Sequence, residues 1–351
     1  MNEQNLFLDS ADISPLHNSL IHDNTEILNI FIDDGLPSTG CALIGKKFEW
    51  KPLLWIMHEA ERIDKSQKTR IVICEGMLTK STKTLIEGIL PTTNLEFIDV
   101  SLSGNHRNYV NSSNMAVSYK DFNRTSLLYY SVGTMRLPRL LIAHWSQKNN
   151  IDNVAYPVMN NIELTAFKHQ LSRLSDYSIE GYNNVEKRVY GNISQKEFNQ
   201  RQTEKLRKCR INIVSEQAWF DNIEGFLCEK FTDAVANKCL PFFVGNRNDN
   251  QYIKKLGFEP YVGFDYSPLE HENFIERWTG LLDKNKSALT DPTINSEIYY
   301  LNRPIIDHNF EVLKNTDWKQ KALDELSLLP ISVKNFLQET FFKTSYKKIF
   351  F

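Results

Sequence analysis

The sequence predicts an α/β protein with two lobes, each built on a parallel sheet. Short apolar runs alternate with segments of helical periodicity, and buried parallel strands joined by helices produce this pattern. The chain of 351 residues, 41% hydrophobic and 24% charged, is long enough for two packed domains. A polar region rich in Asn and Tyr at 175–199 interrupts the alternation and divides it into two series.

The first series lies upstream of that region. The run ILNIFI at 27–32 ends in two aspartates and a glycine, which is typical of a buried strand that enters a loop. Apolar residues recur at helical spacing over 50–63, and RIVIC at 70–74 predicts the next strand. The same reasoning predicts helices at 81–90 and 137–147 and strands at 95–100 and 127–132.

The second series begins at Arg210 with the strand INIVS. Its further elements are a helix at 226–239, strands at 241–244 and 260–264, and helices at 269–282, 318–328 and 333–342. We therefore expect a first lobe at 1–170, a second lobe at 171–330 and a helical tail at 331–351. Ligands of open α/β sheets bind at the carboxyl ends of the strands, so the crevice between the lobes is the expected site.

The composition predicts the compartment in which the protein acts and excludes some classes of partner. Lys and Arg number 41 against 43 Asp and Glu, so no overall positive charge draws the chain to nucleic acid or to an anionic membrane. No signal peptide or stretch of about 20 apolar residues is visible, which predicts a cytoplasmic protein without membrane insertion. Five widely spaced cysteines are expected to be reduced, buried thiols: Cys41, Cys74, Cys209, Cys228 and Cys239.

Missing motifs argue against several enzyme classes. The sequence contains no phosphate-binding P-loop, no G-x-G-x-x-G after a strand, no H-E-x-x-H and no C-x-x-C. It also lacks the G-x-S-x-G of serine hydrolases and the D-x-D with which some enzymes hold a metal-bound sugar nucleotide. We therefore expect no metal and no bound cofactor.

The most informative segment runs from 211 to 245. A buried strand ends in Ser215-Glu216-Gln217, and a helix is expected to open near Phe226 with Glu229 and Lys230 in its first turns. Unpaired backbone N–H groups, the positive end of the helix dipole and Lys230 together suit a diphosphate. Glu229 can accept hydrogen bonds from sugar hydroxyls, and Asp233 is expected beside it on the exposed face.

These residues resemble the carboxyl-terminal motif of the α1,3-fucosyltransferases and of fucosyltransferase-like glycosyltransferases of bacteria and viruses. Glu216 and Gln217 stand in the F-E-N-like tripeptide, Phe226 to Lys230 in the aromatic-x-T-E-K box, and Leu240 to Gly245 in the closing strand. Gln217 replaces the usual Asn and Cys228 the usual Thr, so GDP-fucose does not follow as the donor. The match covers about a tenth of the chain.

A second resemblance to these families lies at 131–141, where a strand is followed by arginines. Arg136 and Arg139, three residues apart, share one helical face, and such arginines reach the donor phosphates in the families. The resemblance implies a GT-B architecture, in which two Rossmann-like lobes flank a cleft and the donor lies mostly on the second lobe. The donor-binding residues it implies are Arg136, Arg139, Glu216, Gln217, Phe226, Glu229 and Lys230.

A catalytic base is expected in the first lobe. Inverting sugar transfer requires a carboxylate that takes the proton of the acceptor hydroxyl. Glu75, at the end of RIVIC, resembles the glutamate of the families' G-E-N motif, although the order of Gly and Glu is reversed. Asp33 and Asp34, at the end of ILNIFI, are rival candidates, and each carboxylate could equally cap a loop or helix.

The function that the sequence predicts is metal-independent, inverting transfer of a sugar from a nucleotide-sugar donor. The acceptor is a glycan or a hydroxymethylated base in DNA, in which case the site of action is the host cytoplasm of a virus. The basic stretch at 205–210 favours DNA if it lines the acceptor cleft. A binding module for nucleotide or glycan without catalysis is the alternative. The oligomeric state is left open.

Overall fold

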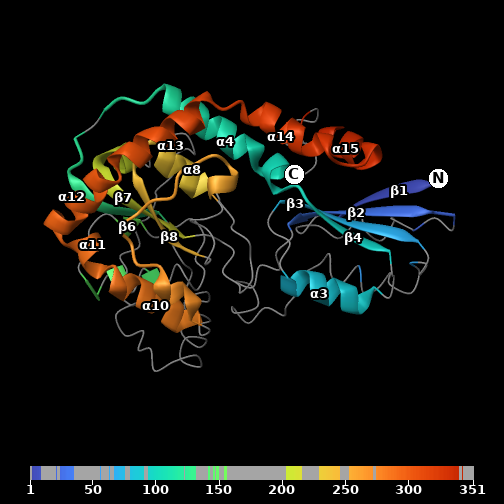
Figure 1. Ribbon diagram of the computed structural model, residues 1–351, viewed down its shortest axis with the longest axis horizontal. Coiled ribbons are helices and arrows are strands. Elements are labelled where there is room, and N and C mark those ends of the chain that lie inside the picture. The colour runs from blue at the N-terminus through green and yellow to red at the C-terminus, as the bar shows by residue number, and fades with distance from the viewer. Residues whose placement is uncertain are drawn as a thin grey trace, which may run out of the picture.

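Figure 1 shows the computed structural model, in which helices cover two parallel β-sheets. The first sheet has the order β1-β2-β3-β4 and the second the order β6-β5-β7-β8, and all neighbouring strands are parallel. This confirms the predicted α/β class. The structure describes residues 2–8, 21, 24–34, 56, 63, 67–75, 80–90, 94–121, 123–131, 141–142, 145–146, 148–149, 154–155, 203–215, 229–245, 253–271, 274–339 and 342.

The predicted strands and helices that fall on described residues appear in the predicted order, apart from the strand at 260–264, whereas the strands at 3–8 and 154–155 were not predicted. The strands are β1 (Glu3–Leu8), β2 (Ile27–Asp34), β3 (Lys68–Glu75), β4 (Leu95–Asp99), β5 (Ser126–Ser131), β6 (Val154–Ala155), β7 (Cys209–Ser215) and β8 (Leu240–Val244). The helices are α3 (Lys80–Ile89), α4 (Ser101–Val117), α8 (Glu229–Ala236), the 3₁₀ turn η4 (Ser267–Glu270), α10 (Phe274–Lys284), α11 (Lys286–Thr290), α12 (Pro292–Leu301), α13 (Arg303–Asn315), α14 (Trp318–Ser327) and α15 (Ile331–Gln338). The helix expected at 50–63 lies almost entirely outside the described residues, and of the helix expected at 137–147 the described residues 141–142 and 145–146 are helical.

The first sheet is buried on both faces. Alternate residues of β2 enter different clusters, so that Ile30 packs with Ile86 of α3, whereas Phe31 packs with helices from the end of the chain. The register places Ile30 beside Ile71 and Phe31 beside Val72 of β3. Burial on both faces explains why β2 and β3 read as continuous apolar runs.

Two long connections join the sheets. Helix α4 leaves the end of β4 and packs against α8, α13 and α14 beside the second sheet, and α14 runs back alongside α4 (Figure 1). Helix α15 then lies on the first sheet, where the Phe336 ring is 4.2 Å from that of Phe31 and the Ser332 hydroxyl donates to Glu3. The carboxyl-terminal helices therefore help to cover the amino-terminal sheet.

Helix α4 is absent from the sequence-based prediction because its composition disfavours a helix. Its sequence SLSGNHRNYVNSSNMAV consists largely of Ser, Asn and Gly, which are weak helix formers. Tertiary packing stabilises this helix, since its intrinsic propensity does not. Tyr109 is buried with its ring 4.6 Å from that of Trp318, and Ala116 is buried in the same core.

The predicted strand at 260–264 is wrong, because the backbone there bonds to side chains. Asn309 exchanges two hydrogen bonds with the backbone of Glu259 and Asn302 exchanges two with that of Val262. Asn285 bonds in the same way to Asp265. Three buried asparagines, one on α13 and two at the turns between helices, thus satisfy an extended segment that would otherwise need a neighbouring strand.

Further observations concern the ends of elements and the position of the second sheet in the chain. The helix expected at 269–282 is the turn η4 followed by α10, and the helices α11 to α13 were not predicted. The second sheet begins with β5, upstream of the lobe boundary expected at 170 and 171, which lies outside the described residues. Among the described helices, none combines the length and apolar character needed to cross a membrane.

Candidate functional site

The carboxyl ends of β7 and β8 form the edge at which a ligand is expected. Ser215, the last residue of β7, pairs in register with Val244, the last residue of β8. The Ser215 side chain is fully buried, and its hydroxyl has no hydrogen-bond partner among the residues that the structure describes. An unsatisfied buried hydroxyl is costly to folding, so its position at the ligand-binding edge of a parallel sheet is notable.

Helix α8 follows β7 in the chain and packs against β7 and β8. Its apolar residues Phe231, Ala234 and Val235 are buried, as their helical spacing predicts. The Phe231 ring lies 5.7 Å from that of Phe243 in β8 and meets the ring of Phe258 edge to face. This packing fixes the helix and thereby the residues of its first turn.

Glu229 and Lys230 form the start of α8 as the structure describes it. The Lys230 ammonium lies 2.7 Å from Glu229 Oε1, and the two side chains are 12% and 48% exposed, respectively. Lys230 is therefore largely withdrawn from solvent, although it lies on a helix end. A shielded cation at the positive end of a helix dipole interacts more strongly with an anion than an exposed lysine does.

The prediction that Asp233 lies beside Glu229 on an exposed face of the helix is wrong. Its carboxylate packs against α4, where Ser112 Oγ donates to Asp233 Oδ1 at 3.0 Å. Burial, with help from the negative charge of Glu229, raises the pKa of Asp233 to about 6, although the hydrogen bond from Ser112 and the charge of Lys230 oppose this shift. No sequence pattern indicated this contact, because α4 was not predicted.

The fold also brings together two of the candidate bases. Asp34 and Glu75 are register partners at the ends of β2 and β3, and Asp33 immediately precedes that pair. The backbone therefore places the three acidic residues at the carboxyl edge of the first sheet. Outside the described residues lie five predicted donor-binding residues: Arg136, Arg139, Glu216, Gln217 and Phe226.

The basic stretch at 205–210 lies at the opposite edge of the second sheet. It precedes and enters β7 at that strand's amino end, and Arg207 Nε donates to Asn237 Oδ1 at 3.1 Å. The Arg207 guanidinium also lies over the Tyr119 ring, 5.9 Å from its centroid. The stretch favours DNA only if it lines the acceptor cleft, which is expected at the carboxyl ends of the strands. Its position at the amino end of β7 does not meet that condition.

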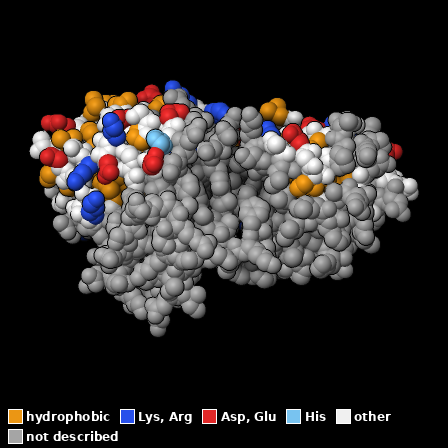
Figure 2. Space-filling model, turned by 90° about the horizontal axis from the view of Figure 1, so that it is seen from below, with side chains coloured by type: hydrophobic (Ala, Val, Ile, Leu, Met, Phe, Trp, Pro, Cys, Tyr) orange, Lys and Arg blue, Asp and Glu red, His pale blue; other side chains and the backbone are white. Residues whose placement is uncertain are grey.

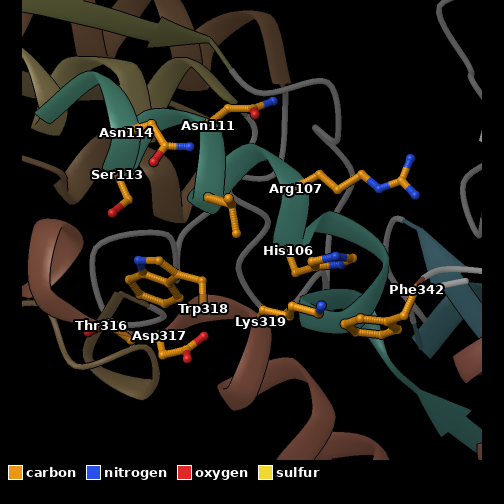
Figure 3. Close-up of a pocket in the computed structure, with 11 residues that line it drawn as sticks. His106, Arg107, Asn111, Ser113, Asn114, Thr316, Asp317, Trp318, Lys319 and Phe342 are labelled. Carbon is orange, nitrogen blue, oxygen red and sulfur yellow. The ribbon is translucent and has the colours of Figure 1, made fainter. Parts of the chain in front are cut away.

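A separate cavity of about 430 Å³ lies between α4 and the turn that leads from α13 into α14. Figure 3 shows the Trp318 and Lys319 side chains below α4 and the Phe342 ring beside His106, and these two rings stack at 4.4 Å. Arg107 also lines the cavity, as does Asp317, whose carboxylate caps α14. Because the lining carries both signs of charge, it does not select for an anion, and it contains none of the predicted site residues.

The structure of the described residues contains no group of three or more His, Cys, Asp or Glu placed to hold a metal ion. Comparisons of the chain with protein-family models, with curated proteins and with solved structures found no match.

Proposed function

We propose that the protein is an inverting glycosyltransferase that uses a nucleotide-sugar donor and needs no metal. The observation that carries the proposal is the shielded ammonium of Lys230 at the start of α8, in the connection that follows the carboxyl end of β7. Lysine and the amides of a helix end suit a diphosphate. The unpartnered hydroxyl of Ser215 marks the same edge as a place for a polar ligand.

The proposed architecture is GT-B, with the acceptor on the first sheet and the donor on the second. The return of α14 and α15 to the first sheet supports a two-lobed arrangement, since it ties the lobes together beside α4. In this architecture the acidic edge of β2 and β3 supplies the base, and the edge of β7 and α8 supplies the diphosphate site.

The chemistry assigns a role to each residue type. The acceptor oxygen attacks the anomeric carbon, the bond from that carbon to the diphosphate breaks, and a carboxylate takes the acceptor proton. Glu75 is our first choice for the base and Asp33 the second. Lys230, with Arg136 and Arg139, stabilises the charge of the departing diphosphate, while Glu229, Glu216 and Gln217 bind hydroxyl groups and Phe226 packs beside the donor.

The acceptor class is a hydroxyl of a glycan or of a hydroxymethylated base in DNA. The position of the basic stretch at the amino edge of the second sheet removes the reason to prefer DNA. On the face in Figure 2, the coloured Lys and Arg side chains are interspersed with Asp and Glu.

The test is a thermal-shift panel of UDP, GDP, CDP and their sugars, followed by an assay for release of the nucleoside diphosphate. We expect one nucleotide family to raise the melting temperature of the wild type. In Lys230→Ala this rise should be smaller, and either the affinity for that nucleotide or the rate of turnover should fall at least tenfold. The matched control is Lys286→Ala, because Lys286 is exposed on α11. Stabilisation without release identifies a binding module, and unchanged turnover in Lys230→Ala contradicts the proposal.

A further inference from the structure

Two cysteines that are far apart in the sequence meet at the amino edge of the second sheet. Cys209 is the first residue of β7 and Cys239 directly precedes β8. Their sulfur atoms are 3.5 Å apart, and both residues are fully buried and free thiols. A disulfide requires the sulfurs to approach to about 2 Å, which is a small movement from this position.

A buried arginine makes the two sulfurs chemically different. Arg124 Nη1 lies 3.4 Å from Cys239 Sγ and 2.6 Å from the carbonyl oxygen of Cys209. Of the described residues, no carboxylate pairs with Arg124, whose remaining partners are carbonyl groups and the Tyr119 hydroxyl. Cys239 is therefore the sulfur on which this guanidinium stabilises a negative charge.

The protonation of the pair follows from these contacts. Burial raises the pKa of Cys239, but the hydrogen bond from Cys209 and the charge of Arg124 outweigh it and lower that pKa overall. Burial raises the pKa of Cys209 well above its usual value. In its neutral form the Cys239 thiol donates to the carbonyl of Leu206, and in its ionised form it accepts from Arg124 and Cys209.

We propose that Cys209 and Cys239 form a modification site, at which hydrogen peroxide converts the two thiols to a disulfide. The Cys239 thiolate attacks one peroxide oxygen, giving a sulfenic acid and hydroxide. The Cys209 thiol then displaces the sulfenic oxygen as water, which forms the S–S bond. Peroxide takes up the two electrons, and the balance is two thiols and one peroxide to one disulfide and two waters.

Burial determines how this site reacts. Peroxide is close to water in size, so it needs only a local opening, whereas bulky reagents are excluded from two fully buried sulfurs. The S–S bond joins the two ends of the segment 209–239, which contains β7 and α8. The disulfide therefore links the start of β7 to the start of β8, and the linked segment carries Lys230 on α8. The proposal does not depend on which ligand α8 binds.

The first experiment maps the disulfide in the wild-type protein. After treatment with hydrogen peroxide and alkylation of the remaining thiols, trypsin without reductant is expected to release Cys209-Arg210 joined to the peptide Cys239–Arg247. The linked species has lost two hydrogen atoms and disappears on reduction. Disulfides or sulfinic acids that form without this linkage, or no oxidation of either cysteine in excess peroxide, would overturn the proposal.

The second experiment tests the different roles of the two sulfurs, using a pair of matched variants. In Cys209→Ser, treatment with peroxide, followed by unfolding of the protein in the presence of dimedone, which traps sulfenic acids, is expected to label Cys239. In Cys239→Ser, we expect Cys209 to be labelled at least tenfold more slowly, since its pKa is raised. Equal labelling in the two variants contradicts the role of Arg124. The wild-type map remains decisive if either variant fails to fold.

Discussion

The two edges of the second sheet differ in how their strands are held together by side-chain hydrogen bonds. At the amino edge, Arg124 binds the carbonyl oxygens of Leu206, Cys209 and Asn237, and it thereby ties the starts of β5, β7 and β8 together. At the carboxyl edge, the buried hydroxyl of Ser215 has no partner in the described part of the chain. Among the described residues, the amino edge is tied together by three hydrogen bonds of Arg124, although the buried Nε of Arg210 there also has no partner, and the carboxyl edge keeps the unbonded hydroxyl of Ser215.

This difference indicates a division between stability and function within one sheet. Groups that bond to one another hold the strands in register, whereas groups without partners carry a cost in the free protein that a ligand can remove. We therefore expect substitutions at the amino edge to change the free energy of unfolding, and substitutions at the carboxyl edge to change ligand binding.

The largest effect is expected from Arg124→Met. Three buried carbonyl groups each lose a hydrogen bond from a charged donor, so the free energy of unfolding should fall by about 2–4 kcal/mol. Urea denaturation measures the change. The control is Arg303→Met, because Arg303 pairs with Asp307 near the surface and should cost about 0–1 kcal/mol. Equal losses in the two variants would contradict the claim that the hydrogen bonds of Arg124 stabilise the fold more than a surface ion pair does.

Asp233→Asn is expected to stabilise the protein at neutral pH. Asp233 has a pKa of about 6 in the folded state, above the value of 3.8 for a free side chain, so folding binds its proton more tightly. Its presence therefore lowers stability progressively as pH rises from about 4 to about 6, and the penalty is complete above that range.

The asparagine variant lacks this penalty. We expect it to exceed the wild type by about 1–3 kcal/mol at pH 8 and to match it near pH 4, as measured by urea denaturation across that range. Ser112 can still donate to the amide oxygen of the asparagine. A difference that does not depend on pH would show that Asp233 does not titrate as its burial predicts.

The smallest effects come from a pair of serines. Ser112→Ala removes the donor to Asp233 and should cost about 1–2 kcal/mol at pH 8. Ser215→Ala removes a buried hydroxyl that has no partner, so the free energy of unfolding should stay within about 0.5 kcal/mol of the wild type or rise. A loss in Ser215→Ala as large as that in Ser112→Ala would contradict the contrast between the edges.

The sequence predicted the parts of the fold that depend on local pattern. The runs ILNIFI and RIVIC are strands because both faces of the first sheet are buried, and β7, α8 and β8 follow one another as expected. Helix α4 could not be predicted, since its Ser and Asn residues gain helical structure only through packing on Trp318 and α8. Long-range contacts, not local propensity, decide such a segment.

The candidate site was predictable in part for the same reason. The position of Lys230 at a helix start follows from the order of strand, loop and helix. The burial of Asp233 does not, because Ser112 lies on the unpredicted helix 121 residues away in the chain. Likewise, nothing in the sequence indicated that Asn302 and Asn309 would take the place of a strand partner for 259–262.

The most direct measurement of the central claim is hydrogen exchange with and without the nucleoside diphosphate that the thermal-shift panel selects. If the start of α8 binds the diphosphate, exchange should slow at residues 229–233 and stay unchanged at 206–210, at the amino edge. Protection at the amino edge alone, or saturation with nucleotide that leaves the first turn of α8 unprotected, would contradict the account.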